Sequence, residues 1–143
     1  MYQLRKLKSL LLLLLVAVSA RAQIENGKVY NFVNVGNNTQ SMVIAANNFV
    51  SIATTNTSDY DQLWYVSKNS DNSYSLRNLG SGRYLRSSNA ASVKWTMVKE
   101  EYVDASCKFS CTAAGSGYTL RATNTTDGGH YMHYGANQGA VVG

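Results

Sequence analysis

The stretch YSLRNLGSGRYLR, residues 74–86, decides the fold of this chain. Apolar and polar residues alternate at its start, and Gly80-Ser81-Gly82 separates this start from a second Tyr-Leu pair. Alternation with a period of two is typical of strands, and closely spaced glycines favour a tight turn. The stretch therefore predicts two short strands joined by a turn.

The start of this stretch recurs at equal intervals. Tyr30, Tyr74 and Tyr118 are each followed by a polar and then an apolar residue, and successive copies begin 44 residues apart. Two equal intervals around one pattern indicate an internal repeat. Each copy also contains short apolar segments between polar turns, which predicts four strands per copy. The expected strands cover residues 29–35, 41–45, 48–53 and 62–66, then 74–79, 84–87, 93–98 and 108–112, then 118–122, 130–134 and a strand from 140 onward.

The third copy is shorter than the others. By the 44-residue period, a counterpart of Gln62-Leu63-Trp64 would fall near position 150, whereas the sequence ends at Gly143. We therefore expect the last strand to be missing. The sequence is then a fragment of a longer protein, or the strand is supplied in some other way, and the apolar end of the chain favours a fragment.

Three copies of four short strands favour one architecture. A single copy cannot bury its own apolar face, but three copies around a pseudo-threefold axis close a six-stranded barrel capped by three hairpins, which leaves few exposed strand edges. The sequence thus predicts an all-β chain: a β-trefoil of three four-stranded repeats of about 44 residues, with the last strand missing. Residues 99–104 are expected to form a loop or a short helical turn.

Residues 1–22 have the features of a signal peptide. Basic residues come first, Leu10 to Val18 is unbroken apolar sequence, and small residues precede Gln23. The apolar run is much shorter than the roughly 20 residues that a membrane-spanning helix needs. We therefore expect no permanent membrane anchor, a secreted protein of the periplasm or the extracellular space, and a single domain over residues 23–143.

The net charge of the chain resides mainly in this leader. Four of the 13 basic residues lie within residues 1–22, which leaves nine basic against eight acidic residues in the rest of the chain. A nearly neutral domain lacks the basic surface that binds phosphate backbones. We expect no nucleic-acid partner.

The two cysteines, Cys107 and Cys111, are four residues apart in a segment that alternates like a strand. In an extended strand they would share one face about 13 Å apart, whereas a disulfide needs Cα atoms within about 7 Å. We expect two inward-facing, unpaired cysteines that act as small apolar residues, although a secreted protein could pair them.

Two motifs resemble a known family. Asp61-Gln62-Leu63-Trp64 resembles the Gln-x-Trp signature of ricin-type β-trefoil lectins, and Gly82-Arg83-Tyr84-Leu85-Arg86 is similar to repeats of its secreted bacterial members. The resemblance covers residues 28–143. It implies a shallow sugar site in each repeat, built from an Asp near the second strand, an aromatic ring and a polar residue beside the Gln. It also implies that Trp64 lies in the core, that Gln62 bonds to backbone, and that Phe109 replaces Trp64 in the second repeat.

The sequence departs from the family pattern at the acid. The second-strand regions, residues 41–45, 83–86 and 130–133, contain no Asp. Any sugar site must therefore be built differently, from an aromatic platform and nearby hydrogen-bonding groups. Our candidates are Tyr60, which has an aspartate on each side, with Asp61, Gln62 and Trp95. The ring of Trp95 could equally belong to the core.

Catalytic chemistry has little support in the sequence. No pair of acids has the spacing of a glycosidase site, and His130 and His133 would point to opposite faces of a strand. We expect no catalytic residue, no cofactor and no metal. The sequence predicts a non-catalytic carbohydrate-binding module, an N-terminal accessory domain with a possible downstream domain, whose partner is a carbohydrate or cell-surface glycan. The alternative is a β-trefoil with decayed sugar sites that acts as a structural or protein-interaction module.

Overall fold

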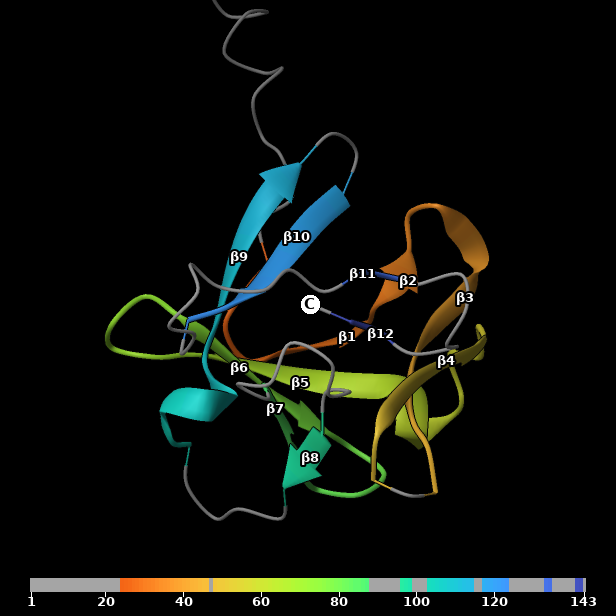
Figure 1. Ribbon diagram of the computed structural model, residues 1–143, viewed down its shortest axis with the longest axis horizontal. Helices are drawn as coiled ribbons and strands as arrows, with labels where there is room; N and C mark the ends of the chain where they lie inside the picture. The colour runs from red at the N-terminus through yellow and green to blue at the C-terminus, as the bar shows by residue number, and fades with distance from the viewer. Residues whose placement is uncertain are drawn as a thin grey trace, which may run out of the picture.

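The computed structural model describes residues 24–46, 48–87, 96–98, 103–114, 117–123, 133–134 and 141–142 (Figure 1). These residues form strands and two short 3-10 helices. The elements are β1 (Lys28–Asn31), β2 (Val33–Asn34), β3 (Asn37–Ile44), β4 (Val50–Thr54), η1 (Tyr60–Gln62), β5 (Leu63–Lys68), β6 (Tyr74–Asn78), β7 (Tyr84–Arg86), β8 (Thr96–Val98), η2 (Ala105–Cys107), β9 (Phe109–Ala114), β10 (Gly117–Ala122), β11 (His133–Tyr134) and β12 (Val141–Val142). No described helix is long and apolar enough to cross a membrane. The predicted signal peptide, residues 1–22, lies outside the described residues.

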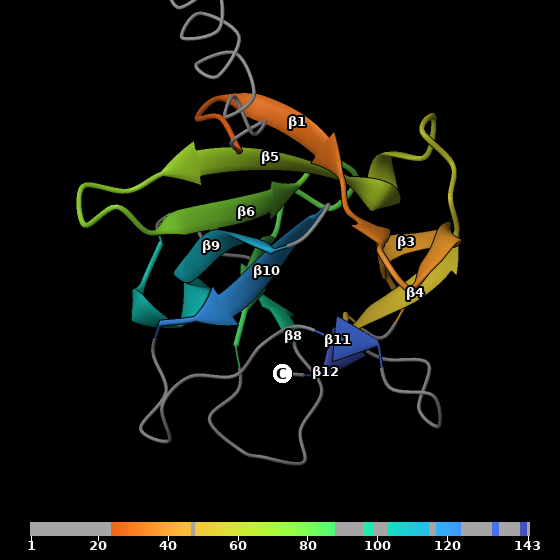
Figure 2. The same cartoon turned by 90° about the horizontal axis from the view of Figure 1, so that it is seen from above.

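Five strands pair side by side as the wall of a barrel. They are antiparallel neighbours in the order β1-β5-β6-β9-β10, as Figure 2 shows. Three of them, β1, β6 and β10, carry the repeated tyrosines, and β5 and β9 end the first and second repeats. The second and third strands of the repeats pair as the hairpins β3–β4, β7–β8 and β11–β12. This arrangement is a β-trefoil, which confirms the predicted fold class.

Several predicted strand bounds need correction. The strand expected over residues 29–35 is divided at Phe32, because β1 pairs with β5 whereas β2 pairs with β3 across a register shift between Val33 and Asn34. The Asn34 side chain accepts hydrogen bonds from the backbone of the next turn, so β3 can start as early as Asn37. The strand expected from Gln62 starts at Leu63, since Gln62 belongs to η1. Of the loop or short helical turn expected over residues 99–104, residues 99–102 lie outside the described residues.

The core lies between the barrel wall and the hairpins. Trp64 and Phe109 are fully buried, and Tyr74 is 6% exposed. The other repeated tyrosines, Tyr30 and Tyr118, pack against the same cluster. The remaining buried members are Ile24, Met42, Val50, Val66, Leu76, Leu85, Leu120 and Ala122. The expectation that Trp64 and Phe109 occupy equivalent core positions is thus confirmed, and the three repeated tyrosines take part in the same packing.

Both cysteines are free, as predicted. Cys107 is buried and Cys111 packs against the core. They do not share a strand, however, because Cys107 ends η2 and Cys111 lies within β9. Removal from water raises the pKa of each thiol to about 11, so both remain neutral thiols well above neutral pH.

We expect slow modification of both thiols in the folded protein. At pH 8, the raised pKa values should make alkylation by iodoacetamide roughly a hundredfold slower than in urea, because the thiolate is the reactive form. A thiol whose pKa is raised on folding contributes to the free energy of unfolding at pH values below its unfolded pKa of about 8.5. This contribution is lost as the pH rises toward 11. Mass spectrometry measures the labelling, and equal rates with and without urea would refute the assignment.

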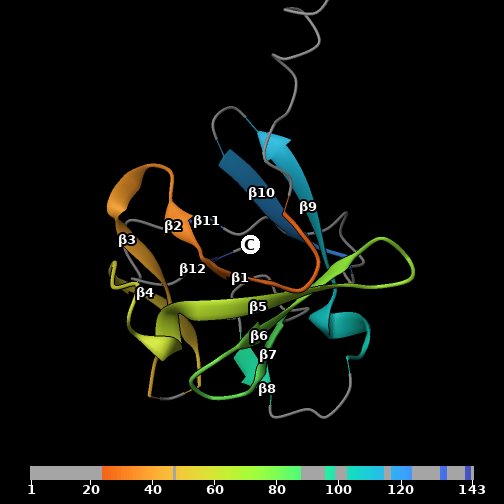
Figure 3. The ribbon, with the colours of Figure 1, turned by 180° about the vertical axis from the view of Figure 1, so that it is seen from behind.

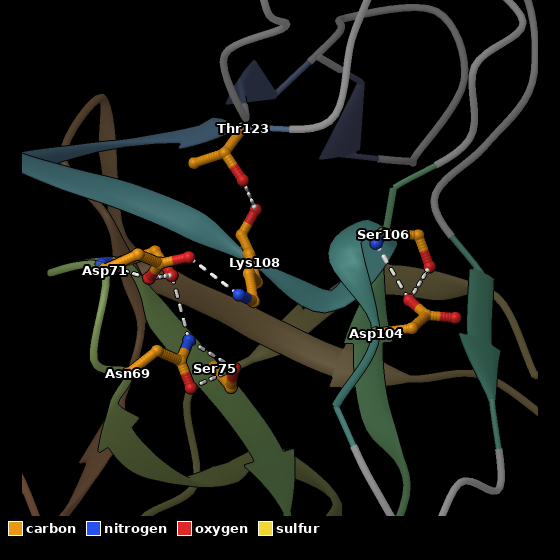
Figure 4. A network of polar contacts seen from close by, with 8 residues as sticks. Asn69, Asp71, Ser75, Asp104, Ser106, Lys108 and Thr123 are labelled. Atoms are coloured by element: carbon orange, nitrogen blue, oxygen red, sulfur yellow. Dashed lines mark hydrogen bonds and ion pairs between the residues drawn. The ribbon is translucent and has the colours of Figure 1, made fainter.

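A polar network joins the turn between β5 and β6 to the start of β9 (Figure 4). Lys108, which precedes β9, donates to Oδ2 of Asp71 in the β5–β6 turn at 2.7 Å, and the Ser73 hydroxyl and backbone N–H donate to Oδ1. These donors, that of Lys108 first, hold the pKa of Asp71 well below its usual range. The stabilisation is present above the unfolded pKa of about 4 and is lost as the pH falls below it. Because Asp71 is exposed and Lys108 is partly exposed to solvent, we expect the effect to be small.

Candidate functional site

The candidate loop is η1, the short 3-10 helix that leads into β5. Asp59 caps it, because its side chain accepts from the backbone N–H of Asp61 at 3.0 Å and its carbonyl accepts from that of Gln62 at 2.9 Å. Capping by a short acidic side chain satisfies N–H groups that the helix leaves without partners. The tight turn leaves Tyr60 and Asp61 exposed and Gln62 buried.

Gln62 anchors the loop from beneath. It is 3% exposed, and its Oε1 accepts from the Ser41 hydroxyl at 2.6 Å and from the Asn56 backbone N–H at 2.9 Å. Its Nε2 donates to the Thr54 carbonyl at 3.0 Å and to Asp59 at 3.3 Å. The expected bonds from Gln62 to backbone are therefore present. The amide has two donors and one oxygen with two acceptor sites, so its capacity is used within the protein. Gln62 is placed to support the loop instead of contacting a sugar.

Asn78, at the end of β6, fastens the loop from the other side. This fully buried residue directs Nδ2 at the carbonyls of Tyr60, Asp61 and Leu63, at 3.4, 2.8 and 3.3 Å. Its Oδ1 accepts from the backbone N–H and the hydroxyl of Ser81. One side chain thus joins η1 to the turn after β6. Sequence reasoning missed this residue, although an Asn that ends a strand directly before a Gly-rich turn is a recognisable signal.

Tyr60 carries an exposed ring on a backbone that hydrogen bonds hold in place. The side chain is 65% exposed, and its carbonyl accepts from the Gly80 N–H at 3.0 Å. Leu79, 39% exposed, lies in the same turn and donates its N–H to the Leu63 carbonyl at 2.9 Å. An exposed ring on a fastened backbone offers a flat apolar surface whose position is fixed at its base.

Asp61 lies directly against this turn. A Cβ added to Gly80 would sit 2.0 Å from the Asp61 Oδ1, so a side chain there would displace the carboxylate from this position. Asp61 is also exposed, next to Tyr60 in sequence. Tyr60 and Asp61 are therefore both exposed on η1, and Gln62 is buried beneath the loop. Trp95, the remaining candidate, lies outside the described residues.

The second repeat has the same loop without the ring. Asp104 caps η2 by accepting from the Ser106 backbone N–H at 2.8 Å, as Asp59 caps η1. Cys107 then takes the buried place of Gln62, and Ala105 stands where the first repeat has Tyr60. Of the two loops that the structure describes in full, only the one at η1 presents an aromatic ring. The described residues also contain no cluster of three or more His, Cys, Asp or Glu that could hold a metal ion.

The barrel, the hairpins and the buried Gln62–Trp64 segment together define a β-trefoil. Residues 60–142, more than half of the chain, match the family described as ricin-type β-trefoil lectin domain-like. The chain belongs to this family. No curated protein sequence matches it.

Several solved structures share the fold. A Polyporus squamosus lectin bound to Neu5Acα2-6Galβ1-4GlcNAc is 15% identical, with a TM-score of 0.68 over 85% of this chain and 45% of that one. A GlcNAcα1-4Gal-releasing endo-β-galactosidase from Clostridium perfringens is 16% identical, with a TM-score of 0.67 over 80% of this chain and 28% of that one. A mosquitocidal holotoxin is 19% identical, with a TM-score of 0.69 over 83% of this chain and 15% of that one. This chain thus spans less than half the length of each.

Proposed function

We propose that residues 23–143 form a secreted, non-catalytic carbohydrate-binding module, an N-terminal accessory domain of a larger protein. Membership in a lectin-like family supports carbohydrate binding. The longer chains support the modular role, since the similar region is only 28% of a glycosidase chain and 15% of a toxin chain. The signal-peptide pattern of residues 1–22 supports secretion.

The observation that carries this proposal is the exposed ring of Tyr60 on a backbone that the loop holds in place. Sugars present flat patches of C–H groups, which pack on aromatic faces, and hydroxyls, which donate to carboxylates. Tyr60 supplies the face, and the neighbouring carboxylate of Asp61 supplies the acceptor. Gln62 and Asn78 fix the loop beforehand, so little ordering cost remains for binding.

The site is open and has one ring, and these two features limit its expected affinity for a sugar. Only one face of a sugar can contact Tyr60, and the Asp of the family pattern is not found in the second-strand regions. A few such contacts minus the entropy cost of association leave a dissociation constant on the order of 1 mM per site. Neutral oligosaccharides presented at high density are therefore the suitable probe, because multivalent display raises the apparent affinity.

Replacing Tyr60 should weaken this binding and leave the fold intact. On a glycan array, we expect Tyr60→Ala to lose at least about fivefold in retention, as one stacking ring contributes about 1 kcal/mol or more. Tyr60→Trp should retain binding, since it preserves the flat surface. The unfolding midpoint of Tyr60→Ala should stay within about 0.5 kcal/mol of wild type, as for other exposed positions. Unchanged retention by Tyr60→Ala would refute the site, and no retention of any glycan by the wild type would refute the function.

The second candidate function is a structural or protein-interaction module with decayed sugar sites. Two observations favour it: the missing Asp of the family pattern and Ala105 in the place of Tyr60 on η2. Under this alternative, no glycan on the array is retained, and Tyr60→Ala behaves like wild type. The array therefore separates the two functions.

A further inference from the structure

The outer face of β5, β6 and β7 carries side chains that the core does not use. Alternate residues of these strands are buried: Trp64, Val66, Leu76, Asn78 and Leu85. Because successive side chains in a strand point to opposite faces, the residues between them point outward. These include Tyr65, Arg77 and Tyr84. Figure 3 shows the three strands side by side from behind.

The three residues form one row across the sheet. Tyr65 pairs with Arg77, and Arg77 pairs with Tyr84 in antiparallel register. Directly paired side chains have Cβ atoms about 5 Å apart. The arginine thus lies between two tyrosines on the outer face. Tyr65 is 38% exposed, Arg77 is exposed and Tyr84 is half-buried.

The Arg77 guanidinium is held along one edge. Its Nε donates to the Gly82 carbonyl at 3.1 Å. Gly82 has a φ of +69°, and a Cβ there would lie 3.5 Å from Nη2, so the turn passes close beneath the group. Among the described residues, no other hydrogen-bond or ion-pair partner of Arg77 is found. The two Nη groups therefore keep their donors for a ligand, and the group has already lost part of its freedom.

We propose that Tyr65, Arg77 and Tyr84 form a second binding surface, which takes the carboxylate of an acidic glycan. A guanidinium is planar and matches a carboxylate with two parallel hydrogen bonds. The tyrosines supply ring faces and hydroxyls for the sugar to which the carboxylate belongs. Exposed Arg86, two residues after Tyr84, adds positive charge at the end of the same strand. This surface goes beyond the neutral-sugar site at Tyr60, which does not involve the guanidinium.

Calorimetric titration with three probes tests the proposal. Oligogalacturonate and oligosialic acid represent the two sources of a sugar carboxylate, and methyl-esterified oligogalacturonate has the same rings without the charge. The wild type should bind at least one acidic probe, more weakly at higher salt, and should bind the ester at least tenfold more weakly. Arg77→Ala should reduce the affinity for the acidic probe at least tenfold. Arg77→Lys should fall in between, because it keeps the charge and loses the planar pair of donors.

The matched control is Lys68→Ala, which removes one exposed positive charge at the end of β5. Its affinity should stay within twofold of wild type. Equal losses in Lys68→Ala and Arg77→Ala would overturn the proposal, since they would show general attraction by charge. The proposal would also be overturned if the wild type bound neither acidic probe, or if it bound the methyl ester as tightly as the acidic probe. Tyr60→Ala should retain the acidic probe, so this site and the Tyr60 site can fail separately.

Discussion

Replacing Trp64 with Ala should lower the free energy of unfolding by about 3–5 kcal/mol, the range for a large buried ring. Trp64 is fully buried, and its Nε1 donates to the Met42 carbonyl at 3.3 Å. The substitution leaves a cavity in the core and removes the bond between β5 and the β3–β4 hairpin. Since small domains are stable by only about 5–15 kcal/mol, much of the total would be lost. Urea unfolding followed by circular dichroism measures the change.

The matched control for this prediction is the next residue. Tyr65 lies on the same strand but points outward and is 38% exposed. Tyr65→Ala should therefore cost no more than about 1 kcal/mol. Trp64→Phe should be intermediate, because it refills most of the cavity but does not restore the hydrogen bond. If Tyr65→Ala and Trp64→Ala were equally destabilising, the placement of Trp64 in the core would be wrong.

Replacing Asn78 with Ala should cost about 2–4 kcal/mol. The change leaves the Asp61 carbonyl and the Ser81 N–H without their side-chain partner, and each buried group left in this way costs about 1–3 kcal/mol. The loop at η1 is held to the turn after β6 largely by this side chain. We therefore expect Tyr60 to lose its fixed position as well. Urea unfolding measures the stability, and hydrogen exchange of the η1 amides measures the loosening.

Asn78→Asp tests the effect of the side-chain hydrogen bonds on stability separately from the effect of side-chain volume. The carboxylate would place a second oxygen against carbonyl oxygens, so at neutral pH this variant should be at least as unstable as Asn78→Ala. Burial and these carbonyls raise the pKa of the new carboxyl in the folded state. Its protonated form can donate, so the variant should regain stability as the pH falls. Ser81→Ala, which removes a hydroxyl partner of Oδ1 and the acceptor of the Arg83 N–H, should cost about 1 kcal/mol. A loss from Asn78→Ala no greater than this would contradict the assigned network.

The repeat could be predicted from sequence because its signals are local. The tyrosines recur every 44 residues on β1, β6 and β10, and Trp64 and Phe109 occupy equivalent buried positions. Alternation along a strand indicates which face is buried, and for this reason the sequence predicts the core positions of Trp64 and Phe109. The division of the first strand at Phe32 depends instead on which neighbour each half pairs with, and no local pattern contains that information.

The site was only partly predictable for the same reason. Tyr60 and Asp61 could be selected because they are adjacent in a polar loop. The supports of that loop are distant in sequence, since Gln62 meets Ser41 and Asn78 reaches back to Asp61. The sequence offers Gln62 both as a candidate contact and as a residue that bonds to backbone, and the structure shows its buried amide bonded within the protein. A second Asp cap, Asp104, 45 residues after Asp59, is the sequence signal that indicates a repeated loop structure.

A titration followed by nuclear magnetic resonance tests the central claim, that the η1 loop binds carbohydrate, most directly. The probe is the neutral oligosaccharide that the array retains best, added to the 15N-labelled protein. We predict that the largest amide shifts fall on residues 59–62 and 79–81, and that Tyr60→Ala removes them while the remaining spectrum stays folded. Shifts confined to other residues, or no shifts at millimolar sugar, would contradict the proposed site.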